Sequence, residues 1–266
     1  MKTHLVNGGR VTHDGDVYRL SIPTTSDATY ADAQLDDYDA QLRNFANEPP
    51  QVLRLRARFS SNQPKGTAGF GFWNAPFGQE GQVLASPNNA WFFHGSPESD
   101  LRVVRNMPGH GFKAAMLNAP QMPYLKPRGS NREPMLSHEP TQDPRGLGTR
   151  NIWSRVANKL LSQPLLSRAA MRAAQAIVNA KEAMLTLDMT KWHDYELDWQ
   201  SDLAIFRVDG REVLRAPKPP RSALGFVAWI DNYKAIAANG QYAFGYVACP
   251  QAQWMELKVI SGPALL

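Results

Sequence analysis

The chain has 266 residues, 43% of them hydrophobic, and a formal net charge of +5. A chain of this length can bury a sizeable core, and its 19 glycines, 20 prolines and 10% aromatic residues favour many short strands over a helical bundle. The single cysteine, Cys249, excludes an internal disulfide framework and a metal site with several cysteine ligands.

The first ten residues lack the apolar core of a signal peptide, and no apolar run reaches transmembrane length. We therefore expect a cytoplasmic protein. The basic charge is confined to one segment, because residues 145–181 hold seven Lys or Arg and no Asp or Glu. That segment carries +7, which leaves −2 for the rest of the chain.

The first part of the chain is predicted to form strands. Alternating apolar residues predict strands at 17–22 and 52–59, while 30–38 fits either a strand or an irregular edge. Strand 52–59 places three arginines on one face: Arg54, Arg56 and Arg58. A later acidic row consists of Asp194, Glu196 and Asp198. We predict that these two strands are neighbours on an outer sheet, with their charges paired.

A glycine-rich stretch at 66–77 predicts a turn followed by a strand that ends in Phe-Trp. Gly69 and Gly71 leave one face of this strand without side chains, which we interpret as close packing, with clearance for a ligand as the alternative. Further strands are expected within 89–100, 101–105 and 111–117.

Residues 118–150 are predicted to be a Pro-rich loop, and residues 151–186 a helical hairpin that Pro164 divides. The second helix, from about Ser167, is expected to bury Ala170, Ala173, Ile177 and Met184. Because strands are predicted on both sides of this segment, we expect residues 1–266 to be a single domain with an insertion.

The basic segment has three interpretations. It is a solvated helix face over a packed one, a lid across a binding cleft, or a contact with an anionic membrane surface through residues 145–181. Nucleic acid is not an expected partner, because the basic residues do not interleave with exposed aromatic residues.

Residues 192–213 have the clearest pattern. From His193 to Trp199 apolar residues alternate with acids, residues 200–202 form a polar turn, and residues 203–208 return to an Asp209-Gly210 turn. This pattern predicts a β-meander. The last strands are expected at 222–230, 242–248 and 254–260.

The pattern His193-x-Tyr195-x-x-x-Trp199, followed by a polar turn and a run ending in Val208-Asp209-Gly210, resembles the meander of glycoside hydrolase family 16 and its concanavalin A-like relatives. The stretch 66–77 and the closing strand 254–260 resemble the same family. The resemblance implies an all-β fold, a concanavalin A-like two-sheet antiparallel β-sandwich (jelly roll), here with the inserted helical hairpin.

The family carries two catalytic glutamates around an aspartate, as Glu-x-Asp-x-Glu or Glu-x-Asp-x-x-Glu, on a strand that corresponds to residues 89–100. That spacing occurs nowhere in this chain. Retaining hydrolysis needs two carboxylates about 5 Å apart, which Trp91 and Phe93 cannot supply. We therefore do not expect the family's retaining glycosidase activity, and whether the chain is an enzyme stays open.

Six residues are candidates for ligand binding, because the resemblance assigns their strands or strand ends to the concave sheet. They are Trp73, Asn74, Trp91, His94, Trp229 and Tyr233. Aromatic rings there stack on sugars or enclose an apolar ligand, and ordinary core packing is the alternative for each ring.

Four residues are candidates for catalysis: His94, Glu98, Asp100 and Asp231. Glu98 and Asp100 are the acids nearest to the missing motif, and His94 or Asp231 would transfer a proton. The structural alternative is a hydrogen-bonded histidine and solvated acids. No metal site or cofactor is predicted, although a structural calcium of the concanavalin type stays open.

Three functional hypotheses remain. The first is a ligand-binding or atypical catalytic protein whose ligand lies on the aromatic concave face under the basic lid. The second is an enzyme of the cyclase, isomerase or lyase type, acting on an apolar small molecule in a lidded pocket. The third is a glycoside hydrolase that uses Glu98 and Asp100. The expected ligand is therefore a glycan or an apolar small molecule.

Overall fold

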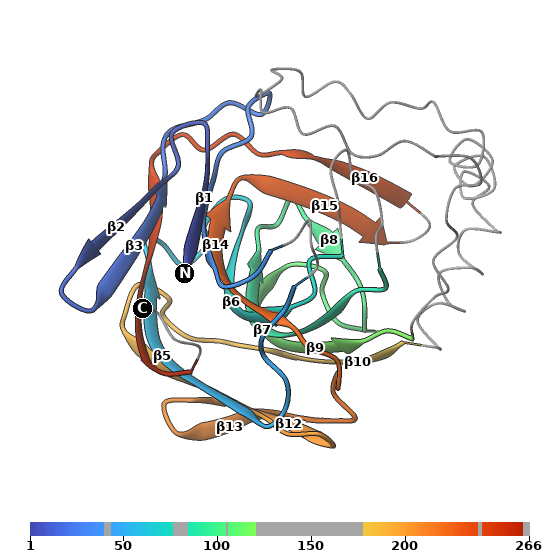
Figure 1. Ribbon diagram of the computed structural model, residues 1–266. Coiled ribbons are helices and arrows are strands. Elements are labelled where there is room, and N and C mark those ends of the chain that lie inside the picture. The colour runs from blue at the N-terminus through green and yellow to red at the C-terminus, as the bar shows by residue number, and fades with distance from the viewer. Residues whose placement is uncertain (40–43, 77–84, 105, 121–177, 239–240, 263–266) are drawn as a thin grey trace, which may run out of the picture.

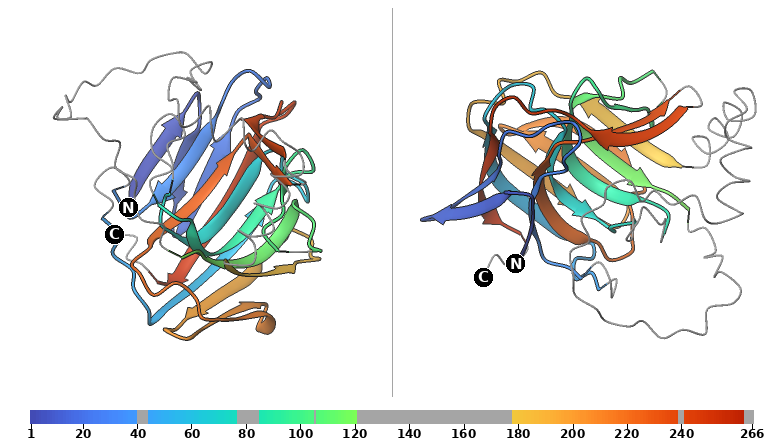
Figure 2. Two further views of the ribbon diagram at one scale, coloured as in Figure 1. Left: turned by 90° about the vertical axis from the view of Figure 1, so that its right-hand side faces the viewer. Right: turned by 90° about the horizontal axis from the view of Figure 1, so that it is seen from above.

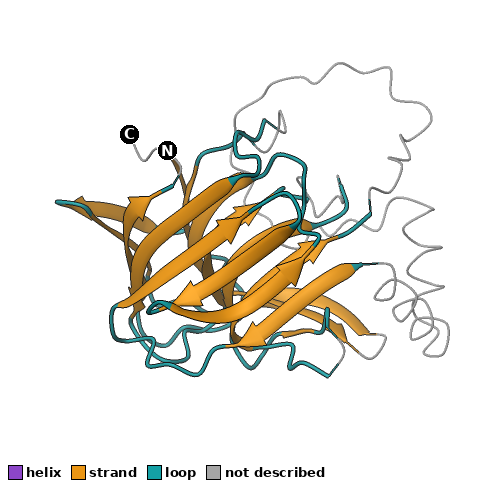
Figure 3. Ribbon diagram, turned by 90° about the horizontal axis from the view of Figure 1, so that it is seen from below, coloured by secondary structure: helices purple, strands orange, loops and turns teal. Residues whose placement is uncertain are grey.

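The computed structural model describes residues 1–39, 44–76, 85–104, 106–120, 178–238 and 241–262. These residues form strands, turns and loops, and no helix occurs among them (Figure 3). The strands make two seven-stranded sheets and one three-stranded sheet (Figure 1).

Sheet A has the strand order β1-β4-β14-β6-β7-β9-β10, and all its neighbouring strands are antiparallel. Its strands are β1 (Lys2–Val6), β4 (Asp32–Asp36), β14 (Gly225–Asp231), β6 (Thr67–Trp73), β7 (Asn88–Gly95), β9 (Gly111–Asn118) and β10 (Asn179–Met184).

Sheet B has the order β13-β12-β11-β5-β17-β3-β2 and is also antiparallel. Its strands are β13 (Arg211–Pro217), β12 (Leu203–Val208), β11 (His193–Trp199), β5 (Gln51–Phe59), β17 (Gln253–Ser261), β3 (Val17–Ile22) and β2 (Arg10–Asp14). The small sheet contains β16 (Gln241–Tyr246), β15 (Tyr233–Ala238) and β8 (Asp100–Leu101).

The facing sides of sheets A and B form the main hydrophobic core. The rings of Phe70 and Phe92 from sheet A lie 4.9 and 5.0 Å from the ring of Tyr195 in sheet B, measured between centroids. Phe72 and Trp199 meet in the same way at 5.3 Å. Sheet A curves, and sheet B covers its convex side (Figures 1 and 2). This architecture is consistent with the predicted antiparallel β-sandwich jelly roll.

The predicted meander is confirmed. β11 and β12 span residues 193–199 and 203–208, and they pair antiparallel. Asp209 and Gly210 form the following turn with φ angles of 50° and 75°, in the left-handed region that an Asp-Gly pair tolerates. The Asp209 carboxylate also accepts hydrogen bonds at 2.9 Å from the Asp194 amide and at 2.7 Å from His193 Nδ1.

The predicted pairing of charged rows is also confirmed. Arg56 lies opposite Asp194 and Arg54 lies opposite Glu196, with Nε–oxygen distances of 3.2 and 2.8 Å. The third arginine, Arg58, pairs with Glu256 on β17. Arg58 does not pair with the third acid of β11, because the register places Asp198 opposite Val52, past the N-terminal end of the row of arginines.

The prediction of a helical hairpin to residue 186 is wrong for its C-terminal end. Residues 179–184 form β10, which pairs with β9 along its whole length, and Met184 is exposed instead of buried. The local sequence favours a helix, but β9 presents a row of backbone groups at the sheet margin, and pairing with that row outweighs the local preference. The remainder of the predicted loop and hairpin, residues 121–177, and its lid and membrane interpretations lie outside the described residues.

Two further details differ from expectation. β1 and β2 at the N-terminus and β15 are not predicted by the sequence pattern, and β8 contains only Asp100–Leu101 in place of the expected strand at 101–105. Within the described part of the chain, no helix is long and apolar enough to cross a membrane.

Candidate functional site

The face of sheet A that points away from sheet B carries a second cluster of aromatic side chains. We call this cluster the aromatic platform; it comprises Tyr38, Phe45, Trp73, Trp91, Phe93 and Trp229. Trp91 is at its centre, with ring centroids 5.7 Å from Trp73, 5.4 Å from Phe93 and 5.2 Å from Trp229. The rings of Trp73, Trp91 and Phe93 are only partly buried, so part of the platform is open.

Glycines on β6 allow these rings to lie across the sheet. Gly69 is directly opposite Trp229 on β14, and a Cβ placed on Gly69 would lie 2.9 Å from the far edge of the Trp229 ring. Gly71 is directly opposite Trp91 on β7, and a Cβ there would lie 2.5 Å from the Trp91 Cα. The space above both glycines is therefore filled by neighbouring residues, which confirms the close-packing interpretation.

Polar groups fix two of the three indoles. Trp229 Nε1 donates to Thr67 Oγ1 at 3.0 Å, and Trp73 Nε1 donates to the Tyr38 hydroxyl at 2.7 Å. The indole N–H of Trp91 has no hydrogen-bond partner within the described part of the chain. Trp91 therefore combines a partly open ring with an available donor.

Two carboxyl groups face each other beside the platform. Asp32 on β4 and Asp231 on β14 occupy directly paired positions of neighbouring strands, and their residues are 2% and 7% exposed. Asp231 Oδ1 accepts hydrogen bonds from the Thr67 amide at 3.1 Å, the Thr67 hydroxyl at 2.8 Å and the Tyr233 amide at 3.0 Å. Asp32 Oδ1 is buried and has no hydrogen-bond partner.

The environment raises the pKa values of both Asp32 and Asp231. Burial raises the pKa of Asp231 to about 6, although hydrogen bonds from Thr67 and Tyr233 oppose the shift. Burial also raises the pKa of Asp32 well above its usual range, and the negative charge of Asp231 raises it further. The pair can therefore hold a proton at a pH where exposed aspartates have lost theirs.

A second polar group lies further along β4. Gln34 Nε2 donates to Asp36 Oδ2 at 2.7 Å and to the Tyr38 hydroxyl at 3.4 Å. Asp36 is 6% exposed, and its burial raises the pKa of the carboxyl. Gln34 is directly opposite Trp229, so these groups form a polar margin along one side of the platform.

The opposite margin carries a buried ion pair. Lys113 is directly opposite Phe93 on β7, and its Nζ lies 3.3 Å from Glu182 Oε2 on β10. The two side chains are 3% and 9% exposed. Burial raises the pKa of Glu182, and the Lys113 charge counteracts that shift. On this side, then, the carboxylate already has a cation.

The structure brings together four of the predicted site residues: Trp73, Trp91, Trp229 and Asp231. Tyr233 belongs to a different aromatic group, with its ring 6.4 Å from Tyr30 and 6.3 Å from Tyr246. Its backbone amide donates to Asp231, and burial and the Asp231 charge raise the pKa of its phenol. Asn74 lies beyond the end of β6, where its side chain bonds the Ser86 carbonyl and the Asn88 amide. Its amide group is therefore used to hold two chain segments together.

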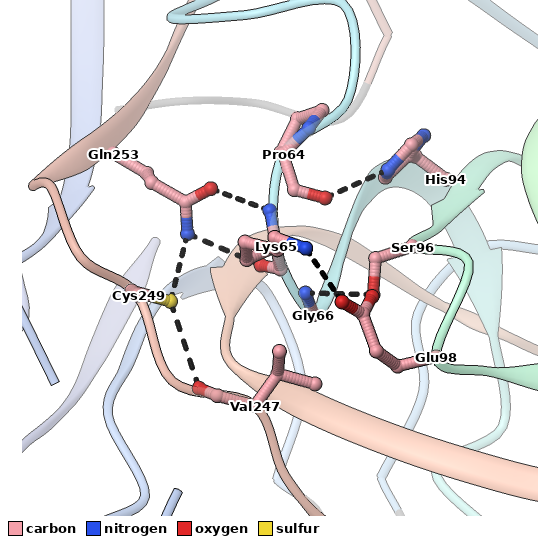
Figure 4. A network of polar contacts seen from close by, with 9 residues as sticks. All are labelled: Pro64, Lys65, Gly66, His94, Ser96, Glu98, Val247, Cys249 and Gln253. Carbon is pink, nitrogen blue, oxygen red and sulfur yellow. Dashed lines mark hydrogen bonds and ion pairs between the residues drawn. The ribbon is translucent and has the colours of Figure 1, made fainter. Parts of the chain in front are cut away.

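His94 and Glu98 lie in a different network, shown in Figure 4. His94 faces the core side of sheet A, opposite Ala68 and Phe112, and its Nε2 donates to the Pro64 carbonyl at 3.0 Å. Burial lowers the pKa of His94 to about 4. Glu98 pairs with Lys65 in the same network, whereas Asp100 pairs with Arg102 at 2.8 Å.

The polar margin formed by Asp32, Gln34 and Asp36 was not predicted from the sequence pattern. A usable signal exists, because these residues alternate with the buried Ala33 and Leu35. Without the neighbouring strand, however, that alternation does not show which strand the acids face. Among the described residues, no group of three or more His, Cys, Asp or Glu side chains is arranged to hold a metal ion.

No protein-family model matches the chain, and no curated protein matches it in sequence. Solved structures that resemble it include a legume lectin-like domain from Entamoeba histolytica, with 6% identity, a TM-score of 0.46, and coverage of 97% of this chain and 89% of that chain. A glycosyl hydrolase family 16 protein from Mycobacterium smegmatis has 10% identity, a TM-score of 0.41, and coverage of 94% and 77%. The catalytic domain of a Thermotoga petrophila endo-1,3-β-glucanase (laminarinase) has 10% identity and a TM-score of 0.38, and the match covers 95% of this chain and 82% of that chain. Identities of this size assign no chemistry to the chain.

Proposed function

We propose that the chain binds a carbohydrate on the outer face of sheet A. The observation that carries the proposal is the aromatic platform, whose rings contact one another on the face turned away from the core. Aromatic rings pack against the C–H faces of sugar rings, and neighbouring carboxyl and amide groups bond the sugar hydroxyls.

The polar margin favours a hydroxyl-rich ligand over an apolar one. Asp32, Asp36 and Asp231 are all buried beside the platform. An apolar molecule lying over them would desolvate these carboxyls further without offering a hydrogen bond, at a cost of about 1–3 kcal/mol for each group left unpaired. A sugar presents hydroxyl groups to this margin instead.

Trp91 is the residue for the first test. Its ring contacts three other platform rings, and its N–H is available to a ligand. We expect Trp91→Ala to weaken binding of laminari-, cello- or chito-oligosaccharides at least tenfold, or about 1.4 kcal/mol, as measured by isothermal titration calorimetry.

Trp192→Ala is the matched control, since Trp192 lies just before β11 of sheet B, and its ring centroid is 5.7 and 5.0 Å from the guanidinium carbons of Arg56 and Arg58. It should leave the affinity unchanged. The proposal fails if the unmodified protein binds none of the three oligosaccharide series, or if both variants lose affinity equally.

A second candidate function is cleavage of the bound glycan, and the facing carboxyls of Asp32 and Asp231 favour it. With both pKa values raised, one carboxyl can keep a proton while the other is ionised, which is the division of roles that acid-base hydrolysis requires. We expect release of reducing ends from labelled oligosaccharides, abolished by Asp231→Asn with binding retained. If the bound oligosaccharide stays intact on prolonged incubation, the cleavage hypothesis is wrong and binding alone remains.

A further inference from the structure

We propose that the carbohydrate on the aromatic platform carries a free, positively charged amino group, which Asp32, Asp36 and Asp231 receive at the β4–β14 margin. The ligand class is therefore an amino sugar with an unsubstituted amine. This inference rests on the proposed carbohydrate binding and deepens it.

The three carboxyls are placed around one ring of the platform. Along the register of β4 and β14, Asp32 pairs with Asp231, Gln34 with Trp229, and Asp36 with Val227. Residues two apart on a strand point to the same face and are about 7 Å apart. The Trp229 position is thus flanked by carboxyls on both sides along the strand direction.

The positive charge beside these carboxyls comes from exposed side chains. The donors to Asp231 Oδ1 are neutral amide and hydroxyl groups, and the donor to Asp36 Oδ2 is the neutral Gln34 amide. His4 Nε2 lies 3.9 Å from Asp32 Oδ2, but its side chain is 63% exposed. Lys2 is opposite Asp36 in register, and its Nζ pairs with Asp39 at 3.6 Å. The charges of His4 and Lys2 oppose the rise that burial causes in the Asp36 pKa.

One carboxyl oxygen at this margin still lacks a donor. Asp32 is 2% exposed, and its Oδ1 has no hydrogen-bond partner. Burying a carboxylate without a cation or a full set of donors is costly. A ligand ammonium supplies three N–H donors and one positive charge, whereas a hydroxyl supplies one donor and no charge.

The aromatic rings add to the preference for a cation. Trp229 and Trp91 lie 5.2 Å apart between centroids, and the negative faces of indole rings attract an ammonium within about 6 Å. The opposite margin differs, because the Glu182 carboxylate is already paired with Lys113 at 3.3 Å. The amine therefore belongs at the β4–β14 margin and the neutral part of the sugar over Trp91.

The test compares two oligomers that differ only in the amine: a glucosamine tetramer and an N-acetylglucosamine tetramer, titrated calorimetrically at about pH 6. We expect the glucosamine tetramer to bind at least tenfold more tightly at low salt, with most of that advantage lost at roughly 0.5 M NaCl. Asp32→Asn and Asp36→Asn should each remove most of the advantage, measured as the ratio of the two affinities within the same variant.

Asp194→Asn is the matched control, because it removes the same charge from the outer face of sheet B and should keep the advantage. Binding of the N-acetylated tetramer shows that each variant is folded. Equal affinities for the two tetramers, or an advantage that persists in Asp32→Asn and Asp36→Asn, would overturn the amine assignment and leave carbohydrate binding standing. Failure of both tetramers to bind the unmodified protein would overturn both proposals.

Discussion

Trp229 and Gly69 are directly paired across β14 and β6, and the Trp229 ring occupies the place that a Gly69 side chain would take. The ring can lie across the sheet only because this position has no Cβ. The aromatic platform therefore depends on a glycine as much as on the rings themselves.

Replacing this glycine should disrupt the platform. In Gly69→Ala the new Cβ would lie 2.9 Å from the Trp229 ring and 2.4 Å from the Phe92 carbonyl oxygen, so the backbone and the ring must both move. We expect a loss of about 2 kcal/mol in the free energy of unfolding, measured by urea denaturation, together with weaker oligosaccharide binding. Gly95→Ala is the control, because a Cβ there makes only contacts of 3.4 Å or more. Equal losses in the two variants would show that the ring position does not depend on Gly69.

The Asp231 carboxyl should make stability fall as the pH rises. Its pKa is about 6 in the folded chain against 3.8 for an ordinary aspartate, so the folded state binds more protons in that window. The free energy of unfolding that the raised pKa of Asp231 contributes is at most about 3 kcal/mol. It is fully present below about pH 3.8 and is lost as the pH rises through 6. Asp231→Asn should flatten this part of the stability curve. A slope that is the same in both proteins would show that the Asp231 pKa is not raised.

His94 should have the opposite effect over nearly the same window. Burial lowers its pKa from 6.5 to about 4, so the unfolded chain binds more protons between these values. The stability that neutral His94 contributes is complete above pH 6.5 and is lost as the pH falls through 4, again up to about 3 kcal/mol. His94→Gln keeps a donor for the Pro64 carbonyl and should remove the slope.

The two slopes oppose each other in the unmodified protein, and urea unfolding of the two variants across this pH range separates them. Relative to the unmodified protein, His94→Gln should make stability fall more steeply with rising pH, and Asp231→Asn should make it fall less steeply. A change of slope in the other direction in either variant would contradict the assignment of these groups.

Glu256 should contribute more to stability than the exposed acids of sheet B. Its oxygens lie 2.5 Å from Arg19 and 2.6 Å from Arg58, and its side chain is 9% exposed. Because both arginines are more than a third exposed, we expect Glu256→Gln to cost only about 1 kcal/mol. Asp194→Asn, whose partner Arg56 is also exposed, should cost less than about 0.5 kcal/mol. Chemical denaturation of the two variants measures the difference, and equal values would argue against a role for burial.

The sequence by itself determined the strands whose alternation is strong and the contacts between strands that are close along the chain. β11, β12 and the Asp209-Gly210 turn follow from a period of two and a short loop, since both are local properties of the chain. Even the pairing of the arginine row with the acidic row could be predicted, because opposite charges on neighbouring strands stabilise a sheet, but the register that pairs Arg58 with Glu256 could not.

The tertiary structure decided the site. Asp32 and Asp231 are far apart in sequence, and only the register between β4 and β14 places them together. The same applies to Trp229 above Gly69, and to residues 179–184, which become a strand because β9 offers them a backbone partner. Such pairings are fixed by packing of the whole core and by hydrogen bonds between distant segments, so alternation within one strand cannot reveal them.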